Sequence, residues 1–237
     1  MPVFRLTEKL IFPDPELAEE DGLLAVGGDL SEDRLLLAYS MGIFPWYADG
    51  QPLLWWSPDP RLVLMPAELR ISRSLRQVIN KGLFTIKMDT AFAEVIRHCA
   101  WMRRAGQQGT WITEEMTEAY IRLHHAGYAH SVESWQDGEL VGGLYGLALG
   151  RAFFGESMFA KKSSASKVAL VGLAEYLRAL DYSFIDCQVT TEHLKSLGAR
   201  EVPRRKFLRM LKEALACDKD KNTSSQSEGR MNISSIP

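Results

Sequence analysis

Three polar side chains follow apolar, strand-like segments and form the first candidate site. Asp186 and Gln188 come after SFI in SFIDCQV, and Glu156 comes after FFG in RAFFGESMF. Residues two apart on a strand project to one face, so we expect Asp186 and Gln188 to point together. A carboxyl group is costly to bury unless it is paired or hydrogen-bonded. These residues are therefore candidates for catalysis, and the alternative for each alone is a satisfied polar network or a strand end that faces water.

Cysteine and histidine patterns offer weaker chemistry. Cys187 and His193 are six residues apart. A cysteine and a histidine are the residue types of a thiol nucleophile and its general base. On a strand, however, Cys187 points away from Asp186 and Gln188, which favours a buried, inert thiol. The other histidines show no metal-ligand spacing with acids or cysteines, and the three cysteines are too scattered for a zinc site or a disulfide framework. We expect no metal site.

Two tryptophans lie in loops beside glycines, Trp46 in GIFPWYADG and Trp111 in GQQGTWITEE. Exposed loop tryptophans are good stacking platforms for nucleic-acid bases. The alternative is a tryptophan that packs in the core, which is the commoner role of a lone one.

The net charge of −2 hides an uneven distribution. Residues 1–36 carry nine acids and three bases, and residues 218–237 carry three of each, so residues 37–217 have a net charge of +4. Solvated helix faces usually explain such base clusters, but four of them in a balanced body are compatible with a surface that contacts phosphates. The clusters are Arg70, Arg73 and Arg76, spaced for one side of a helix; Arg103 and Arg104; Lys161, Lys162 and Lys167; and Arg204, Arg205, Lys206 and Arg209.

Length and composition set the broad class. The chain has 237 residues, of which 46% are hydrophobic and 24% charged, as in globular proteins with a sizeable core. No apolar run approaches the roughly 20 residues of a membrane span, and charges break every apolar run of the opening MPVFRLTEKLIFPDP, unlike a signal peptide. With few cysteines as well, we expect a cytoplasmic enzyme or binding protein.

Turn residues and periodicity place the elements that must position these side chains. Ser31 is a predicted N-cap of a helix that ends near Gly42. The segments 12–28 and 42–60 are predicted loops, because their prolines and glycines disfavour regular elements. The following predicted elements are a strand at 61–65, a helix at 72–81, a strand at 84–88, and helices at 90–103 and 113–126.

From His130 the pattern becomes β-rich. Strands at 130–136 and 139–149 flank the hairpin turn Asp137-Gly138. A third strand at 151–159, a long apolar helix at 164–180 and a strand at 183–189 follow, and then helices at 191–198 and 203–215. This β-β-β-α-β order is α+β and resembles the GNAT acyltransferases. We divide the chain into a smaller Trp/Pro-rich N-terminal domain (1–66), a GNAT-like domain (67–217) and a disordered tail (218–237).

The GNAT resemblance makes one chemical demand. Enzymes of that class hold the pyrophosphate of coenzyme A on a glycine-rich turn before the long helix. The corresponding segment, KKSSASKVAL, contains no glycine. The sequence therefore disfavours coenzyme A as the acyl source.

Blocks of unusual composition carry a more specific resemblance. They look like the leucyl/phenylalanyl-tRNA–protein transferase family, with no departure inside the blocks, and they run in order from about Gly22 to Arg205. The blocks are GLLAVGGDLS, FPWY, WWSPDPR, GTWIT, AHS, LVGGLYG, FGESMF, ASKVAL, DCQV and SLGA. The tail after about residue 217 has no such motif.

This resemblance implies a defined reaction. The family transfers leucine or phenylalanine, and methionine less readily, from aminoacyl-tRNA to the N-terminal arginine or lysine of acceptor proteins, which marks them for N-end rule degradation. The tRNA ester supplies the activated acyl group, so no metal, nucleotide or coenzyme A cofactor is implied.

The resemblance also implies binding residues. Trp46 and Trp111 would stack on the 3′-terminal adenosine, while Met158, Phe159 and Ile185 would line an apolar pocket for the donor side chain. For the tRNA body we favour the bases that flank the motif blocks: Arg70, Arg73, Arg76, Lys161 and Lys162.

In the catalytic roles that the resemblance implies, Asp186 would orient and polarise Gln188, which would accept a proton from the attacking α-amine. Glu156 would position the reacting groups or attract the cationic acceptor. A neutral amide is a very weak base, however, and an α-amine with a pKa of about 8 is partly neutral already. Gln188 as a purely orienting group is therefore the alternative.

Three other functions remain as alternatives. A peptidoglycan-type aminoacyl-tRNA transferase would share the fold and the donor but use a different acceptor amine. A coenzyme A-dependent N-acetyltransferase would need tight acetyl-CoA binding. A non-catalytic tRNA-binding module would not need the polar cluster at Asp186, Gln188 and Glu156.

Overall fold

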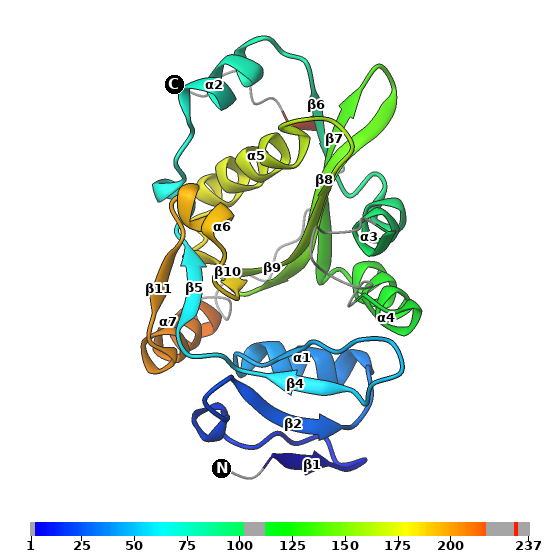
Figure 1. Cartoon of the computed structure of the whole chain (residues 1–237), viewed down its shortest axis with the longest axis vertical. Coiled ribbons are helices and arrows are strands. Elements are labelled where there is room, and N and C mark those ends of the chain that lie inside the picture. The colour runs from blue at the N-terminus through cyan, green and yellow to red at the C-terminus, as the bar shows by residue number, and fades with distance from the viewer. Residues whose placement is uncertain (1–2, 102–111, 217–229, 232–237) are drawn as a thin grey trace.

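Two β-sheets organise the part of the chain that the computed structural model describes, residues 3–101, 112–216 and 230–231 (Figure 1). The smaller sheet has the strand order β1-β2-β4-β3 and the larger one the order β11-β5-β10-β9-β8-β7-β6-β12. The smaller sheet comprises β1 (Phe4–Leu6), β2 (Leu23–Gly27), β3 (Phe44–Pro45) and β4 (Leu54–Trp56).

The small sheet corrects both loop predictions. β2 lies in the segment 12–28 together with the short helix η1 (Pro15–Leu17), and β3 and β4 lie in the segment 42–60. Proline is tolerated in β3 because this strand is at the edge of the sheet, where a missing N–H breaks no ladder between neighbours. The buried ring of Trp55 anchors β4, with Nε1 donating to the Gly27 carbonyl oxygen at 2.8 Å.

The large sheet confirms the predicted β-β-β-α-β order. Three strands pair antiparallel in sequence, α5 (Ala165–Ala179) crosses over, and the next strand returns parallel to the third, with Phe184 opposite Ala152. The fold is therefore of the mixed α/β class with the predicted GNAT-like order of elements. The strands are β5 (Arg61–Leu64), β6 (Thr85–Met88), β7 (Ala129–Gln136), β8 (Glu139–Leu149), β9 (Ala152–Ala160), β10 (Phe184–Gln188), β11 (Arg200–Val202) and β12 (Arg230–Met231).

The helices follow the predicted spans closely. Ser31 caps α1 as predicted, its hydroxyl accepting from the Arg34 N–H. The bounds are α1 (Glu32–Ser40), η2 (Pro66–Glu68), α2 (Arg73–Asn80), α3 (Phe92–Trp101), α4 (Glu114–His125), α6 (Glu192–Ser196) and α7 (Arg204–Ala216). One expectation changes: α2 begins after its N-cap Ser72, so Arg70 lies before the helix and does not share a helix face with Arg73 and Arg76.

Helices cover both faces of the large sheet, and each face has its own hydrophobic core. α5 packs on β7 and β8 from one side, and α3 and α4 pack from the other (Figure 1). β10 contributes to both cores: Phe184 is buried in the core that includes α1, α4 and the small sheet, and Ile185 in the core beneath α5. The end of β10 therefore lies where the two helix layers and the small sheet meet.

The predicted domain boundaries remain a prediction. β5, which begins at Arg61, already pairs with β10 in the large sheet. Most of the predicted disordered tail lies outside the described residues, with β12 beside β6 as the described part. In the described part of the chain, no helix is long and apolar enough to cross a membrane.

Candidate functional site

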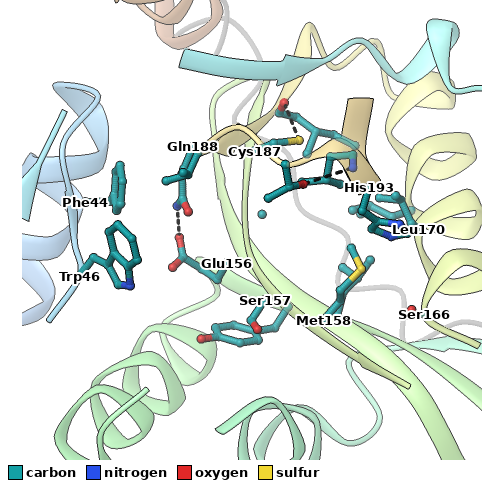
Figure 2. A pocket seen from close by; sticks show the side chains of 18 of the residues that line it. Phe44, Trp46, Glu156, Ser157, Met158, Ser166, Leu170, Cys187, Gln188 and His193 are labelled. Atoms are coloured by element: carbon teal, nitrogen blue, oxygen red, sulfur yellow. Dashed lines mark hydrogen bonds between the residues drawn. The ribbon is translucent and has the colours of Figure 1, made fainter. Parts of the chain in front are cut away.

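A cavity of about 550 Å³ opens at the end of β10, between the small sheet, β9 and α5. Figure 2 shows the Gln188–Glu156 contact between Phe44 and Trp46 on one side and Met158 and Leu170 on the other. Most of the lining is apolar, and it includes Leu144, Met158, Leu170, Leu173 and Ile185. The cavity therefore joins an apolar compartment to a small polar group of side chains.

Most of the predicted binding residues reach this cavity. Met158, Ile185 and Trp46 line it. Phe159 does not, because side chains alternate along β9; its ring is buried on the other face, 4.9 Å from the ring of His98. Trp111 lies outside the described residues, so its placement stays a prediction.

Gln188 and Glu156 are in direct contact. The Gln188 Nε2 amide donates to Glu156 Oε1 at 2.7 Å, and both side chains are buried. This bond fixes the orientation of the amide and directs its carbonyl oxygen away from Glu156, where it can accept a hydrogen bond from a substrate. Gln188 and Glu156, two of the three predicted catalytic residues, thus form one unit at the wall of the cavity.

The contact between Asp186 and Gln188 differs from the prediction that both side chains point to one face of the strand. The pairing of β10 with β5 shifts register between the two residues, and Gln188 has the left-handed φ of 62°. Asp186 Oδ1 accepts a hydrogen bond from the backbone N–H of Gln188 at 2.9 Å. The described contacts include no hydrogen bond between Asp186 and the side-chain amide of Gln188. The prediction from alternating side chains is wrong here because the register shift places an extra residue between Asp186 and Gln188.

The main partner of Asp186 is Arg61, at the start of β5. Arg61 Nε and Nη2 donate to Oδ1 and Oδ2 at 2.9 and 2.7 Å, and both side chains are fully buried. Our sequence reasoning missed this partner. The signal for it was present, because a carboxyl after SFI needs a counter-charge and Arg61 opens the neighbouring apolar run RLVLM.

Two tyrosines complete the surroundings of Glu156. The Tyr39 hydroxyl on α1 donates to Oε1 at 2.7 Å, the Tyr120 hydroxyl on α4 donates to Oε2 at 3.2 Å, and the two hydroxyls also contact each other. Nothing in the sequence marks these tyrosines, because their positions on the apolar faces of two helices are typical of core residues.

Burial raises the pKa of Glu156 to about 7, against hydrogen bonds from Tyr39, Gln188 and Tyr120 that lower it. Burial and the nearby Glu156 charge hold the pKa of both tyrosines well above the usual 10.0. A pKa of about 7 leaves the Glu156 carboxyl partly protonated at neutral pH.

Cys187 and His193 also line the cavity. Burial raises the pKa of the Cys187 thiol well above its usual value, as expected of an inert thiol. The predicted placement is wrong, however, because Cys187 is only half-buried and lines the same cavity as Gln188. Burial and the neighbouring Lys167 lower the pKa of His193. Among the described residues, no group of three or more histidine, cysteine or acidic side chains could hold a metal ion.

The predicted tRNA-binding bases are exposed on the surface. Lys161 and Lys162 follow the end of β9, and Lys161 Nζ lies 2.8 Å from His98 Nε2. The cluster Arg103 and Arg104 lies outside the described residues. The structure places Arg70, Arg73 and Arg76 at and before the start of α2, apart from the cavity lining.

Comparisons with known proteins identify relatives of this arrangement. A family model described as leucyl/phenylalanyl-tRNA protein transferase matches residues 63–212, and a model of that family's N-terminal domain matches residues 28–59. A leucyl/phenylalanyl-tRNA–protein transferase of Syntrophobacter fumaroxidans (strain DSM 10017 / MPOB) is 66% identical over 213 residues, covering 90% of this chain and 91% of that protein. One of Desulfatibacillum aliphaticivorans is 59% identical, covering 91% and 92%.

Solved structures are more distant. L-PGS from Bacillus licheniformis has a TM-score of 0.39 and 13% identity, covering 73% of this chain and 57% of that one. A GCN5-related N-acetyltransferase from Kribbella flavida has a TM-score of 0.33 and 12% identity, covering 71% and 59%. Both scores are below 0.5, so the fold rests on the chain's own topology.

The raised pKa of Glu156 predicts a specific pH dependence of stability. A carboxyl whose pKa rises from 4.5 to about 7 on folding destabilises the folded state as pH rises from about 4.5 to 7. Relative to Glu156→Gln, whose amide does not titrate, the wild-type free energy of unfolding should fall by about 3 kcal/mol over this range. Urea unfolding at several pH values measures the difference. The exposed Glu118→Gln should show none, and a flat difference for Glu156→Gln would contradict the assignment.

Proposed function

Because the chain belongs to the leucyl/phenylalanyl-tRNA protein transferase family, we propose that it carries leucine or phenylalanine, and methionine less readily, to the N-terminal arginine or lysine of acceptor proteins. The protein is an aminoacyltransferase that uses aminoacyl-tRNA as donor and a protein as acceptor. The product would then be a substrate for N-end rule degradation. Since aminoacyl-tRNA is made in the cytoplasm, we place the reaction there. The observation that carries the proposal is an apolar compartment adjoining the Gln188–Glu156 pair.

The apolar compartment supports the choice of donor. Its lining by Leu144, Met158 and Ile185, with Leu170 and Leu173 from α5, suits an uncharged side chain of leucine or phenylalanine size. A shaped pocket of this kind discriminates against a side chain branched at Cβ by about 1–3 kcal/mol for each misplaced methylene. Valine and isoleucine would therefore transfer poorly.

Trp46 supports a nucleoside at the mouth of the compartment. Trp46 lines the cavity beside Phe44, and Trp56 holds the Trp46 backbone, with its Nε1 donating to the Trp46 carbonyl oxygen at 2.6 Å. Stacking of the 3′-terminal adenine on such a ring is worth about 1–3 kcal/mol. Trp111 is the second proposed stacking residue.

The reaction is an aminolysis of the tRNA ester. The α-amine of the acceptor attacks the ester carbonyl, a C–N bond forms, the C–O bond to the ribose breaks, and a proton leaves the amine while the ribose hydroxyl gains one. We assign Gln188 to hold the amine through its amide oxygen, with Asp186 fixing the Gln188 backbone and Glu156 fixing the amide. Asp186 is a poor proton relay because both of its oxygens accept bonds from Arg61. Positioning alone can supply several orders of magnitude in rate.

The tRNA body would lie on the exposed bases. Arg70, Arg73 and Arg76 near α2, and Lys161 and Lys162 after β9, are the proposed contacts. The small surplus of +4 over residues 37–217 suits a protein that grips mainly the aminoacylated 3′ end and releases the tRNA at each turnover.

A transfer assay tests the proposed function directly. The purified protein is incubated with labelled Leu-, Phe-, Met- or Val-tRNA and with peptides that begin with Arg, Lys or Gly. Label should move from Leu- and Phe-tRNA to the Arg and Lys peptides, less from Met-tRNA, and hardly from Val-tRNA. An N-acetylated Arg peptide, which lacks the attacking amine, is the control. Absence of transfer to the Arg peptide would rule the proposal out.

Removing the amide of Gln188 separates orientation from proton transfer. If Gln188 orients the amine, Gln188→Ala should lower kcat by about 100-fold and leave the shape of the pH–rate profile unchanged. Loss of the basic limb of the profile would instead show that Gln188 accepts the proton. Thr190→Ala, two residues further on and outside the cavity lining, should retain the wild-type rate.

The salt dependence of binding tests the proposed tRNA contacts. Replacing one phosphate-contacting base, as in Lys162→Ala, should reduce the slope of log K against log salt by about 1. The exposed Lys195, which pairs with Glu192 at 3.2 Å, provides the matched control variant Lys195→Ala. A slope equal to that of the wild type removes Lys162 from the tRNA surface.

A further inference from the structure

The backbone at Gln188 needs an external constraint. A non-glycine residue with a φ of 62° occupies a sparsely populated conformation, which persists only where the surroundings hold it. The same residue follows a register shift of β10 against β5, after which it pairs with Leu62, so regular strand geometry does not impose this φ. Yet the direction of its amide toward Glu156 depends on this conformation.

Asp186 supplies the constraint. Its Oδ1 accepts the Gln188 backbone N–H at 2.9 Å, which closes a short local turn between a side chain and the backbone two residues on. The carboxylate is itself fully buried, so it keeps its place and its charge only beside a cation. The turn at Gln188 therefore depends on whatever holds Asp186.

Arg61 holds Asp186 with two parallel bonds of 2.9 and 2.7 Å. The guanidinium group also lies over two aromatic rings, with its carbon 4.8 Å from the centre of the Phe44 ring and 4.5 Å from the centre of the Phe207 ring. Phe44 lines the cavity and Phe207 belongs to α7. A planar guanidinium group that is both stacked and bidentate has one orientation, which a lysine ammonium group cannot reproduce.

We propose that Arg61 is a positioning residue of the transfer reaction, which acts through Asp186 to hold Gln188 in its left-handed conformation and its amide against Glu156. The inference rests on the proposed function, in which Gln188 orients the attacking amine. Arg61 itself does not line the cavity. Its effect on the rate therefore passes through the Gln188 side chain.

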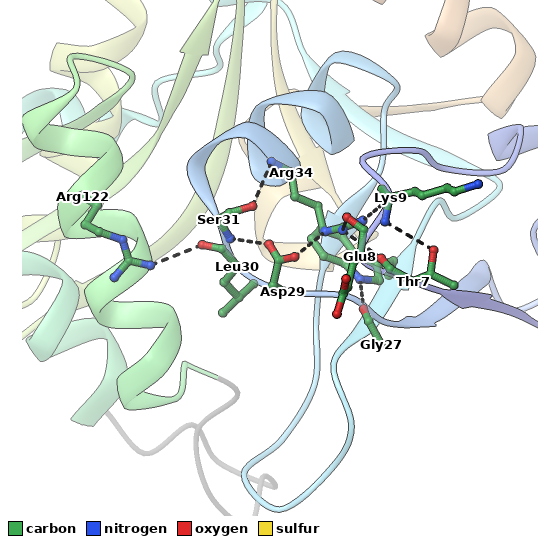
Figure 3. Close-up of polar contacts among 10 residues, drawn as sticks. Thr7, Glu8, Lys9, Gly27, Asp29, Leu30, Ser31, Arg34 and Arg122 are labelled. Atoms are coloured by element: carbon green, nitrogen blue, oxygen red, sulfur yellow. Dashed lines mark hydrogen bonds and ion pairs between the residues drawn. The ribbon is translucent and has the colours of Figure 1, made fainter.

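Arg34 provides a matched comparison. It is as deeply buried as Arg61, and its Nε donates to Asp29 at 3.1 Å (Figure 3). Its other nitrogens donate to carbonyl oxygens of the N-terminal segment, among them that of Thr7 at 3.0 Å. Arg34→Lys therefore disturbs a buried arginine without touching the chain of contacts that ends at Gln188.

A double-mutant cycle tests the proposal. In the wild-type background, Arg61→Lys should lower kcat by about 100-fold and change the KM for aminoacyl-tRNA little, because the donor pocket stays intact. In the Gln188→Ala background the same substitution should change kcat by less than about twofold, since the group it positions is gone. Equal losses in both backgrounds would overturn the proposal, because a general structural defect adds to the loss from Gln188→Ala.

A second variant and a second measurement complete the test. Thermal unfolding shows whether Arg61→Lys folds. If it does not, Asp186→Asn takes its place in the double-mutant cycle with Gln188→Ala, because Asn keeps an acceptor for the Gln188 backbone N–H but weakens the ion pair with Arg61. The NMR signal of the Gln188 side-chain amide should move in either variant and stay in Arg34→Lys; an unmoved signal overturns the proposal. This signal needs no activity, so it tests Arg61 even if the wild-type protein transfers no amino acid.

Discussion

The buried ion pair of Arg61 with Asp186 is the interaction on which the geometry of the site depends. It links the neighbouring strands β5 and β10, and the Asp186 carboxylate also holds the backbone at Gln188. Removing one partner of such a pair leaves a buried charge and typically costs about 3–5 kcal/mol. The same desolvation explains the aromatic rings beside the guanidinium group: Phe44 and Phe207 give it apolar contacts and leave both of its bonds to Asp186 in place. A pair of this kind contributes more to the geometry of its surroundings than to net stability.

The second buried carboxyl group of the site, that of Glu156, has no charged partner among its hydrogen-bond donors. Asp186 is balanced by a full positive charge, whereas Glu156 is surrounded by neutral donors: two phenols and an amide. Neutral donors only partly offset the cost of burial, so the pKa of Glu156 rises to about 7. Two buried carboxyl groups of the site thus have different surroundings because of their partners. Asp186 fixes the Gln188 backbone, and Glu156, with its raised pKa, fixes the Gln188 side-chain amide.

Local sequence patterns predicted most of the fold but only part of the site. The turn at Asp137-Gly138, the apolar period of 165–179 and the cap at Ser31 are local signals, and each element appeared close to its predicted span. The same reasoning failed for Pro45, because an edge position, which makes proline acceptable in a strand, is a property of the whole sheet.

The site residues divide in the same way. Asp186, Gln188 and Glu156 were found because polar residues interrupt apolar runs, and Met158 and Ile185 because the family resemblance implies a donor pocket built from the same segments. Arg61, Tyr39 and Tyr120 come from three other elements, and only the folded chain brings them to β9 and β10. The left-handed backbone of Gln188 depends on a register shift against β5, so counting residues along the strand predicts the wrong relation to Asp186.

The pairing of β5 with β10 also has a consequence for biosynthesis. Arg61 and Asp186 are 125 residues apart in the chain, and their strands are direct neighbours in the sheet. A ribosome that has released β5 must add all of β6 to α5 before the partner strand emerges, and loop closure over such a span is slow. Until then the guanidinium group has no carboxylate. The nascent chain thus completes its transfer site only after β10 has been made, and a product truncated before β10 contains Arg61 but neither Asp186 nor Gln188.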